Sequence, residues 1–154
     1  MNIIELNQKP LLDTNHRLQE VSLQFEKLLT ELRKKELPDK LTMAINKEIE
    51  ALNATYASGD ERRKIIRKIQ TRLIKLIEKE VKLVPRNYYR NLWLTLGMAG
   101  FGIPMGVAFG ASLGNMAFMG VGLPIGMAVG IALGTKMDKK ALAEGRQMDI
   151  EIKY

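Results

Sequence analysis

The chain has 154 residues, with 24 Lys and Arg against 17 Asp and Glu, no cysteine and one histidine. This length excludes a large multidomain enzyme, and the lack of cysteine excludes a disulfide scaffold, a Cys-ligated zinc site and thiol catalysis. The single histidine, His16, leaves little room for a His-based metal site or a catalytic triad. We therefore expect a protein that is not an enzyme, with no catalytic residue, no cofactor and no metal site.

Charge divides the chain into three parts. Residues 1–90 carry 19 basic and 13 acidic groups, residues 91–135 carry none, and residues 136–154 carry five basic and four acidic groups. The basic excess is concentrated between Ser58 and Arg90, directly before the uncharged block. We therefore expect an all-α protein in which a charged helical region precedes an apolar one.

Three helices with apolar stripes are predicted ahead of the uncharged block. Apolar residues recur at three- and four-residue steps over 13–36 and again over 38–56, and Leu37-Pro38 separates these helices. Ser58-Gly-Asp-Glu61 has the form of a capping box, which opens a third helix that ends before Pro85. The stripes contain Leu18, Val21, Phe25, Leu28 and Leu32; Leu41, Ile45, Ile49 and Leu52; and Ile65, Ile66, Ile69, Leu73, Leu76, Ile77 and Leu83.

These stripes predict a cytosolic helical domain over 1–84. Its core is either a plain three-helix bundle or a coiled coil that other subunits complete, because about 75 residues bury little apolar surface alone.

The third predicted helix carries a run of basic residues next to the apolar block. Because this helix leads directly into that block, we expect it to lie against anionic membrane lipids, at about 1 kcal/mol per basic residue. A nucleotide or an acidic cytosolic protein could bind the same run, and a plain solvated helix face is the simplest alternative. No specific nucleic acid is predicted as a partner. The residues are Arg62, Arg63, Lys64, Arg67, Lys68, Arg72 and Lys75.

The uncharged block predicts a transmembrane helical hairpin. One helix of 45 residues would run about 68 Å, more than twice the roughly 30 Å hydrocarbon core of a bilayer. Gly114-Asn115 is the strong turn signal near its midpoint, so we expect spans of about 92–113 and 116–134 within a hairpin of 85–135. A Gly/Ala-rich hairpin buried inside a soluble protein is the alternative interpretation.

The flanking residues predict the orientation of the hairpin. Arg86 and Arg90 precede it, and Lys136, Lys139 and Lys140 follow it, whereas its turn has no charge. By the positive-inside rule, both termini are cytoplasmic and the protein is a multi-pass protein of the inner (cytoplasmic) membrane. We expect a cytosolic tail over 136–154, in which 148–154 alternates like a strand without an obvious partner. The predicted membrane-interface residues are Tyr88, Tyr89, Arg90, Trp93 and Lys136.

Each predicted span carries the same glycine pattern. At an offset of 20 residues, Gly102-Ile-Pro-Met-Gly106-Val-Ala-Phe-Gly110-Ala-Ser-Leu-Gly114 aligns with Gly122-Leu-Pro-Ile-Gly126-Met-Ala-Val-Gly130-Ile-Ala-Leu-Gly134, with seven of the 13 positions identical. Glycine at every fourth residue leaves a groove along one helix face in which another backbone can approach closely. Because four glycines per span exceed what one hairpin contact needs, we expect helix packing within the hairpin and between copies in a homo-oligomer.

Pro104 and Pro124 occupy matching positions in the repeat. Each removes a backbone donor and favours a kink, which membranes tolerate where the freed carbonyl faces protein or a wet cavity. A pore is one interpretation, and simple shaping of the hairpin is the other. The glycines do not form a nucleotide-binding loop, because no strand precedes them and no Gly-Lys-Ser/Thr ending follows.

The glycine repeat is followed by Lys136-Met-Asp-Lys-Lys-Ala-Leu-Ala-Glu-Gly-Arg-Gln147. Together, over about 97–147, these motifs resemble small bacterial glycine-zipper membrane proteins. In architecture alone, the chain is also similar to holins and to two-span membrane effectors of phage defence. Our first hypothesis is an oligomeric membrane protein whose paired spans form a channel or a membrane-permeabilising assembly that the cytosolic helices control, with defence or lysis as its role. The alternative is a non-conducting membrane scaffold that recruits a partner through its basic helices.

Overall fold

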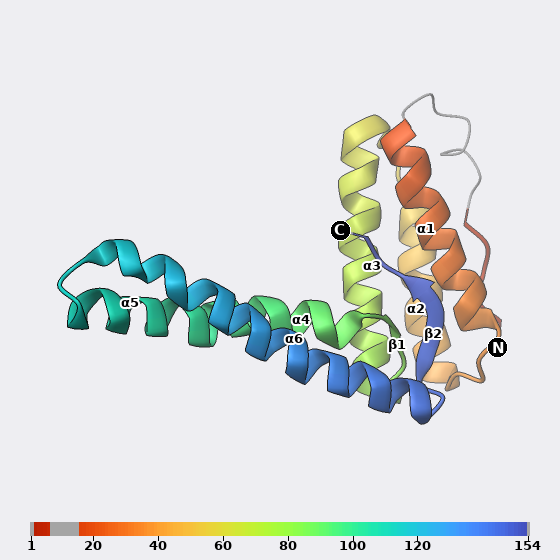
Figure 1. Ribbon diagram of the computed structural model, residues 1–154. Coiled ribbons are helices and arrows are strands. Elements are labelled where there is room, and N and C mark those ends of the chain that lie inside the picture. Colours follow the sequence, from red (N-terminus) through yellow and green to blue (C-terminus); the bar gives the residue numbers. More distant parts are fainter. Residues whose placement is uncertain (1, 7–15, 154) are drawn as a thin grey trace. The chain divides into compact units, whose positions relative to one another are not determined.

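The computed structural model describes residues 2–6 and 16–153, which are mostly helical (Figure 1). They form two compact units. The first consists of Met1–Pro85 with Met148–Tyr154, and the second of Arg86–Gln147. The C-terminal residues thus return to the first unit, where the sequence predicted a separate tail.

The first unit contains the three predicted helices. They are α1 (His16–Arg33), α2 (Asp39–Asn53) and α3 (Gly59–Val81), and both α1 and α2 pack against α3 (Figure 1). The predicted start of the first helix, at 13–15, lies outside the described residues. Ser58 occupies the N-cap position of α3, but its side chain makes no capping hydrogen bond, so the predicted capping box is wrong. The acidic residues Asp60 and Glu61 in the first turn of α3 complement the helix dipole instead.

The apolar stripes are buried within a single chain. Each fully buried Leu, Ile or Phe contributes about 1.5–3 kcal/mol relative to an exposed one. Of the predicted stripe, Ile65 and Leu76 are only half-buried, whereas Ile74 is buried in addition. The bundle therefore has a core of its own, built on Leu18, Phe25, Leu28, Leu32, Ile45, Ile49, Leu52, Ile66, Leu73 and Ile77.

The second unit is a helical hairpin. Its first helix consists of α4 (Tyr88–Gly97), the π-helical segment η2 (Met98–Gly102) and α5 (Ile103–Ser112). The second begins with the 3₁₀ turn η3 (Met116–Phe118) and continues as α6 (Met119–Ala143). The turn lies at the predicted Gly114-Asn115, but α6 runs nine residues beyond the predicted end at Gly134.

Two glycines end the helices of the hairpin. Gly114, with φ +65°, lets the Asn115 amide donate to the Gly110 carbonyl (3.1 Å). Gly145, with φ +68°, lets the Arg146 amide donate to Ala141 (2.8 Å). In both cases the neighbouring glycine amide also bonds back into the last turn, which completes a Schellman motif. The charged residues that follow Thr135 do not break the helix; Gly145 does.

The C-terminal residues that alternate like a strand have a partner. Strand β2 (Gln147–Glu151) pairs with β1 (Val84–Arg86), and Met148, Ile150 and Ile152 are buried (Figure 1). Two side chains of α1 bind the backbone of this stretch. Gln24 both donates to and accepts from Lys153 (3.2 and 3.1 Å), and Glu31 Oε2 accepts from the Asp149 amide (3.3 Å).

The Glu31 contact gives a pH-dependent anchor for β2. Lys34 Nζ, 2.5 Å from Glu31 Oε1, and the Asp149 amide lower the pKa of the Glu31 carboxyl. The folded state therefore favours the ionised carboxylate of Glu31. The stability that this carboxylate contributes is present above the unfolded pKa of about 4.3, and it is lost as the pH falls through the lower pKa of the folded state. We expect the hydrogen-exchange protection of the Asp149 amide to fall over that range. Glu31→Gln should remove this pH dependence, whereas Glu80→Gln, at an exposed site, should keep it.

Candidate functional site

The outer surface of the hairpin is apolar. The helical stretches Tyr88–Ser112 and Met116–Ala143 are both long and apolar enough to span a membrane, with mean hydropathies of 1.6 and 2.0 over their most apolar windows. Only 17% of the most apolar stretch of each helix is buried, whereas a core helix of a soluble protein would be mostly buried. The exposed side chains include Phe101, Ile103, Val107, Phe109, Phe118, Val121, Leu123, Val129 and Leu133.

Glycines fill the contact between the two helices. A β-carbon added at Gly126 would lie 2.5 Å from the Gly97 carbonyl oxygen and 2.6 Å from the Gly102 nitrogen, too close for any side chain. A β-carbon at Gly122 would likewise meet the backbone of Gly102 and Gly106. The two backbones therefore touch directly, and the tight contact also includes Gly110, Gly130 and Gly134.

The π-helical segment η2 sets the register of the first glycine face. Gly97 and Gly102 are five residues apart, whereas the later glycines, Gly102, Gly106 and Gly110, are four apart. A π-helix bonds residues five apart, so it returns the chain to the same face after five residues rather than four. The Ile103 amide accordingly donates to the Met98 carbonyl. Gly97, which regular α-helical spacing does not place on this face, thereby becomes part of the contact.

The sequence predicted more glycines on the packing face than one hairpin contact needs, but the structure has no such excess. Of the eight predicted helix-packing glycines, seven face the other helix of the same hairpin, and Gly114 lies in the turn with open space where its β-carbon would be. The single helix face that they form is used within one chain. The expected packing between copies therefore needs a different surface. Gly100 and Gly120 are candidates, since a β-carbon at either would have no atom within 4 Å.

Asp138 closes the open end of the hairpin. It stands four residues after Gly134, in the same register as the glycines of α6, and is 6% exposed. Its Oδ1 accepts from the Tyr89 amide (3.0 Å) and its Oδ2 from the Arg90 amide (2.9 Å). Because α4 has no capping side chain of its own, Asp138 caps α4 from the other helix.

The predicted membrane-interface residues meet at this same end. A β-carbon at Gly134 would lie 2.5 Å from the Arg90 Cα, and Lys136 follows Gly134 by two residues, so both charged residues that flank the block lie at this end of the hairpin. Tyr88 and Trp93 are half-buried. Tyr89 is 8% exposed and stacks edge-on against Tyr88 (ring centroids 5.2 Å apart), so its ring is buried within the protein. It is held inside because its amide binds Asp138 and its side chain interacts with Arg146.

Both prolines lie inside continuous helical stretches. Pro104 is the second residue of α5, just after the π-helical segment, and Pro124 lies within α6, so neither ends its helix. Both are exposed on the outer surface of the hairpin. Each stands four residues after an outward glycine, Gly100 or Gly120. Since proline has no amide hydrogen, these two glycine carbonyls lack their regular α-helical donor.

The basic run of α3 divides into buried and exposed members. Arg62 is 6% exposed and donates to the Thr55 carbonyl (3.0 Å), and burial lowers its pKa. Its role in binding an anionic ligand stays a prediction. Arg63 pairs with Asp60 (3.3 Å), and Arg72 with Glu48 (2.6 Å). Lys64 is exposed. A surface cavity of about 410 Å³ is lined by Arg67, Lys68, Thr71, Arg72 and Lys75.

Comparison of the chain with family models, with curated proteins and with solved structures gave no significant match.

The glycine contact predicts a sharp difference between inward and outward glycines. In Gly130→Ala, the new β-carbon meets the Trp93 backbone, and overpacking should destabilise the hairpin by about 1–3 kcal/mol. Gly100→Ala fills open space and should be neutral or slightly stabilising. Trp93 is the only tryptophan of the chain, so its fluorescence during SDS unfolding measures the hairpin directly. Equal effects of the two variants would contradict the contact.

The Asp138 cap gives a second prediction. Asp138→Ala leaves the amides of Tyr89 and Arg90 without their acceptor and should destabilise the hairpin by about 0.5–2 kcal/mol. Asp138→Asn keeps one acceptor oxygen and should lose less. The matched control is Lys139→Ala at the next, exposed position of α6. The same Trp93 measurement applies, and a loss in the control as large as in Asp138→Ala would remove the special role of the carboxylate.

Proposed function

We propose that this chain is an integral membrane protein whose hairpin crosses the bilayer twice. Copies of it assemble into a channel or a membrane-permeabilising structure, with defence or lysis as its role, and the cytosolic helical domain controls that assembly. The outer surface of the hairpin is the observation that carries the proposal. It is free of charge from Asn91 to Thr135 and is covered with exposed apolar side chains that water disfavours and lipid accepts.

The outward glycines support an assembly of copies. Gly100 stands ten residues after Arg90, or about 15 Å along the helix, which places it near mid-depth if Arg90 lies at the membrane interface. In hydrocarbon, a carbonyl that has lost its α-helical donor is costly unless another amide of the same helix, a neighbouring protein or water satisfies it, and the five-residue bonding of η2 is one such adjustment beside Gly100. A neighbouring copy or a water-filled path can approach Gly100 and Gly120, because neither has a side chain to cover its carbonyl. The carbonyls of these two outward glycines, rather than the number of glycines per span, are therefore the reason to expect a homo-oligomer.

The exposed part of the basic face supports control by the membrane surface. Arg67, Lys68 and Lys75 stand exposed around the surface cavity of α3, and no ion pair between described residues involves them. They can bind anionic lipid headgroups at about 1 kcal/mol each. Both termini then lie on the cytoplasmic side of the inner membrane, together with the flanking residues Arg86, Arg90 and Lys136.

Dye release from anionic liposomes that carry the purified protein tests this function. The wild type should release the dye, and Gly100→Leu with Gly120→Leu should reduce release several-fold because leucine covers both carbonyls. Ala108→Leu with Ala128→Leu is the matched control: these exposed positions are also 20 residues apart but do not stand four before a proline. It should keep release, and Trp93 fluorescence should be unchanged in both variants.

The alternative function is a membrane scaffold that conducts nothing and recruits a partner through its basic helices. Vesicles that stay sealed while the protein resists carbonate extraction would favour it over the channel. Protein that stays in solution, without lipid or detergent, would overturn both.

A further inference from the structure

Arg62 is a buried cation without a counter-ion. It lies on the core side of α3, four residues before the fully buried Ile66, and is 6% exposed. Burial lowers the pKa of its guanidinium, and no carboxylate of the described residues offsets this effect. Burying an unpaired charge costs free energy, which is why buried charges in proteins are usually paired. The presence of Arg62 at this position therefore needs an explanation other than packing.

The guanidinium of Arg62 uses one of its three nitrogens. Nη1 donates to the Thr55 carbonyl (3.0 Å), whereas the buried Nε and Nη2 find no acceptor within residues 2–6 and 16–153. Nε and Nη2 form one edge of the guanidinium, from which their N–H bonds point in parallel. This edge is a fork that matches two oxygens of a carboxylate or a phosphate. The unpaired donors of Arg62 are thus arranged for an oxyanion.

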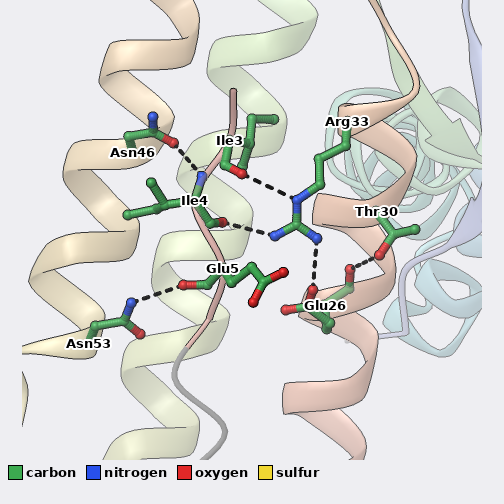
Figure 2. A network of polar contacts seen from close by, with 8 residues as sticks. All are labelled: Ile3, Ile4, Glu5, Glu26, Thr30, Arg33, Asn46 and Asn53. Carbon is green, nitrogen blue, oxygen red and sulfur yellow. Dashed lines mark hydrogen bonds and ion pairs between the residues drawn. The ribbon is translucent and has the colours of Figure 1, made fainter. Parts of the chain in front are cut away.

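Arg33 shows the same edge in use (Figure 2). Its Nε donates to the Ile3 carbonyl (3.3 Å) and its Nη2 to the Ile4 carbonyl (2.9 Å), while Nη1 pairs with Glu26 (2.9 Å). All three nitrogens of Arg33 have acceptors, although its side chain is more exposed than that of Arg62. Other arginines that pair with a carboxylate are Arg63, Arg72 and Arg146. Unpaired donors are therefore not a general property of the arginines in this chain.

The guanidinium of Arg62 lies beside the start of α3. Long side chains of a helix lean toward its N-terminus, and Thr55, which Arg62 binds, precedes the N-cap Ser58 by three residues. The Ser58 side chain makes no capping hydrogen bond, so the first amides of α3 lack the acceptor that a cap supplies. Such amides and the positive end of the helix dipole favour phosphate groups.

The acidic residues in the first turn of α3 leave Arg62 unpaired. Asp60 pairs with Arg63 (3.3 Å), and Glu61 is exposed. The turn 54–58, which contacts the guanidinium, contains no buried residue. A shift of this turn therefore disturbs little packing and gives an anion access to the two unpaired nitrogens.

We propose that Arg62 and the uncapped start of α3 form a binding site for one phosphate group. The fork of Nε and Nη2 binds two phosphate oxygens, and the positive end of the α3 dipole stabilises the negative charge. A soluble phosphate and a lipid headgroup have this chemistry in common. The site is distinct from the exposed residues Arg67, Lys68 and Lys75, and it does not require the hairpin to form a channel.

Thermal unfolding of the full chain in neutral detergent micelles tests the site, with far-UV circular dichroism as the signal. Inorganic phosphate is compared with chloride at equal ionic strength. The unfolding midpoint of the wild type should rise by several degrees, because a ligand that binds only the folded state stabilises it. Arg62→Met removes the charge and should abolish this rise. Lys47→Met, which removes a charge from an exposed position of α2, is the matched control and should keep it.

Phosphatidylglycerol, added to the same micelles without free phosphate, forms a second arm. A rise that Arg62→Met loses and Lys47→Met keeps supports the site, and the arm in which it occurs identifies the source of the phosphate. Arg62→Lys keeps the charge but not the fork, so it should lose most of the rise even where Arg62→Met does not fold. A rise that either Arg62 variant keeps in full, or no rise in either arm, overturns the proposal.

Discussion

The direct contact between two helix backbones is the constraint on which the hairpin depends. With glycine at 97, 102, 122 and 126, no side chain separates the helices, and both turn their larger apolar side chains outward. In lipid, apolar side chains give little driving force for association, so close backbone packing and weak backbone contacts must supply it. The same arrangement that holds the helices together therefore leaves an apolar outer surface.

Two devices keep this contact in one register. The π-helical segment η2 brings Gly97 onto the face that Gly102 and Gly106 define, and Asp138 bonds the first amides of α4 at the open end. Asp138 extends the four-residue spacing of Gly122–Gly134 by one further step. The last position of the glycine face thus carries the carboxylate that fixes the helix start, just outside the uncharged block.

The helical domain binds extended segments by their backbones at two places. Gln24 and Glu31, seven residues apart on α1, bind the C-terminal stretch, and Asn46 and Asn53, seven residues apart on α2, bind residues 2–6. Seven residues are about two helical turns, so each pair lies on one helix face. In both cases these side-chain hydrogen bonds add to the burial of apolar residues of the bound stretch, which are Ile3 in one and Met148, Ile150 and Ile152 in the other.

The sequence by itself determined the helices, their apolar stripes and the turn of the hairpin, because these follow from local periodicity and from strong signals such as Pro38 and Gly114. Only the tertiary structure decided what depends on residues far apart in the chain: that β2 pairs with β1, that Asp138 caps α4, that Arg62 is buried, and that the glycine face is used up inside one hairpin. Gly97 is the clearest case. Regular α-helical spacing leaves it off the glycine face, and the extra residue in the π-helical turn, which local propensity does not reveal, puts it there.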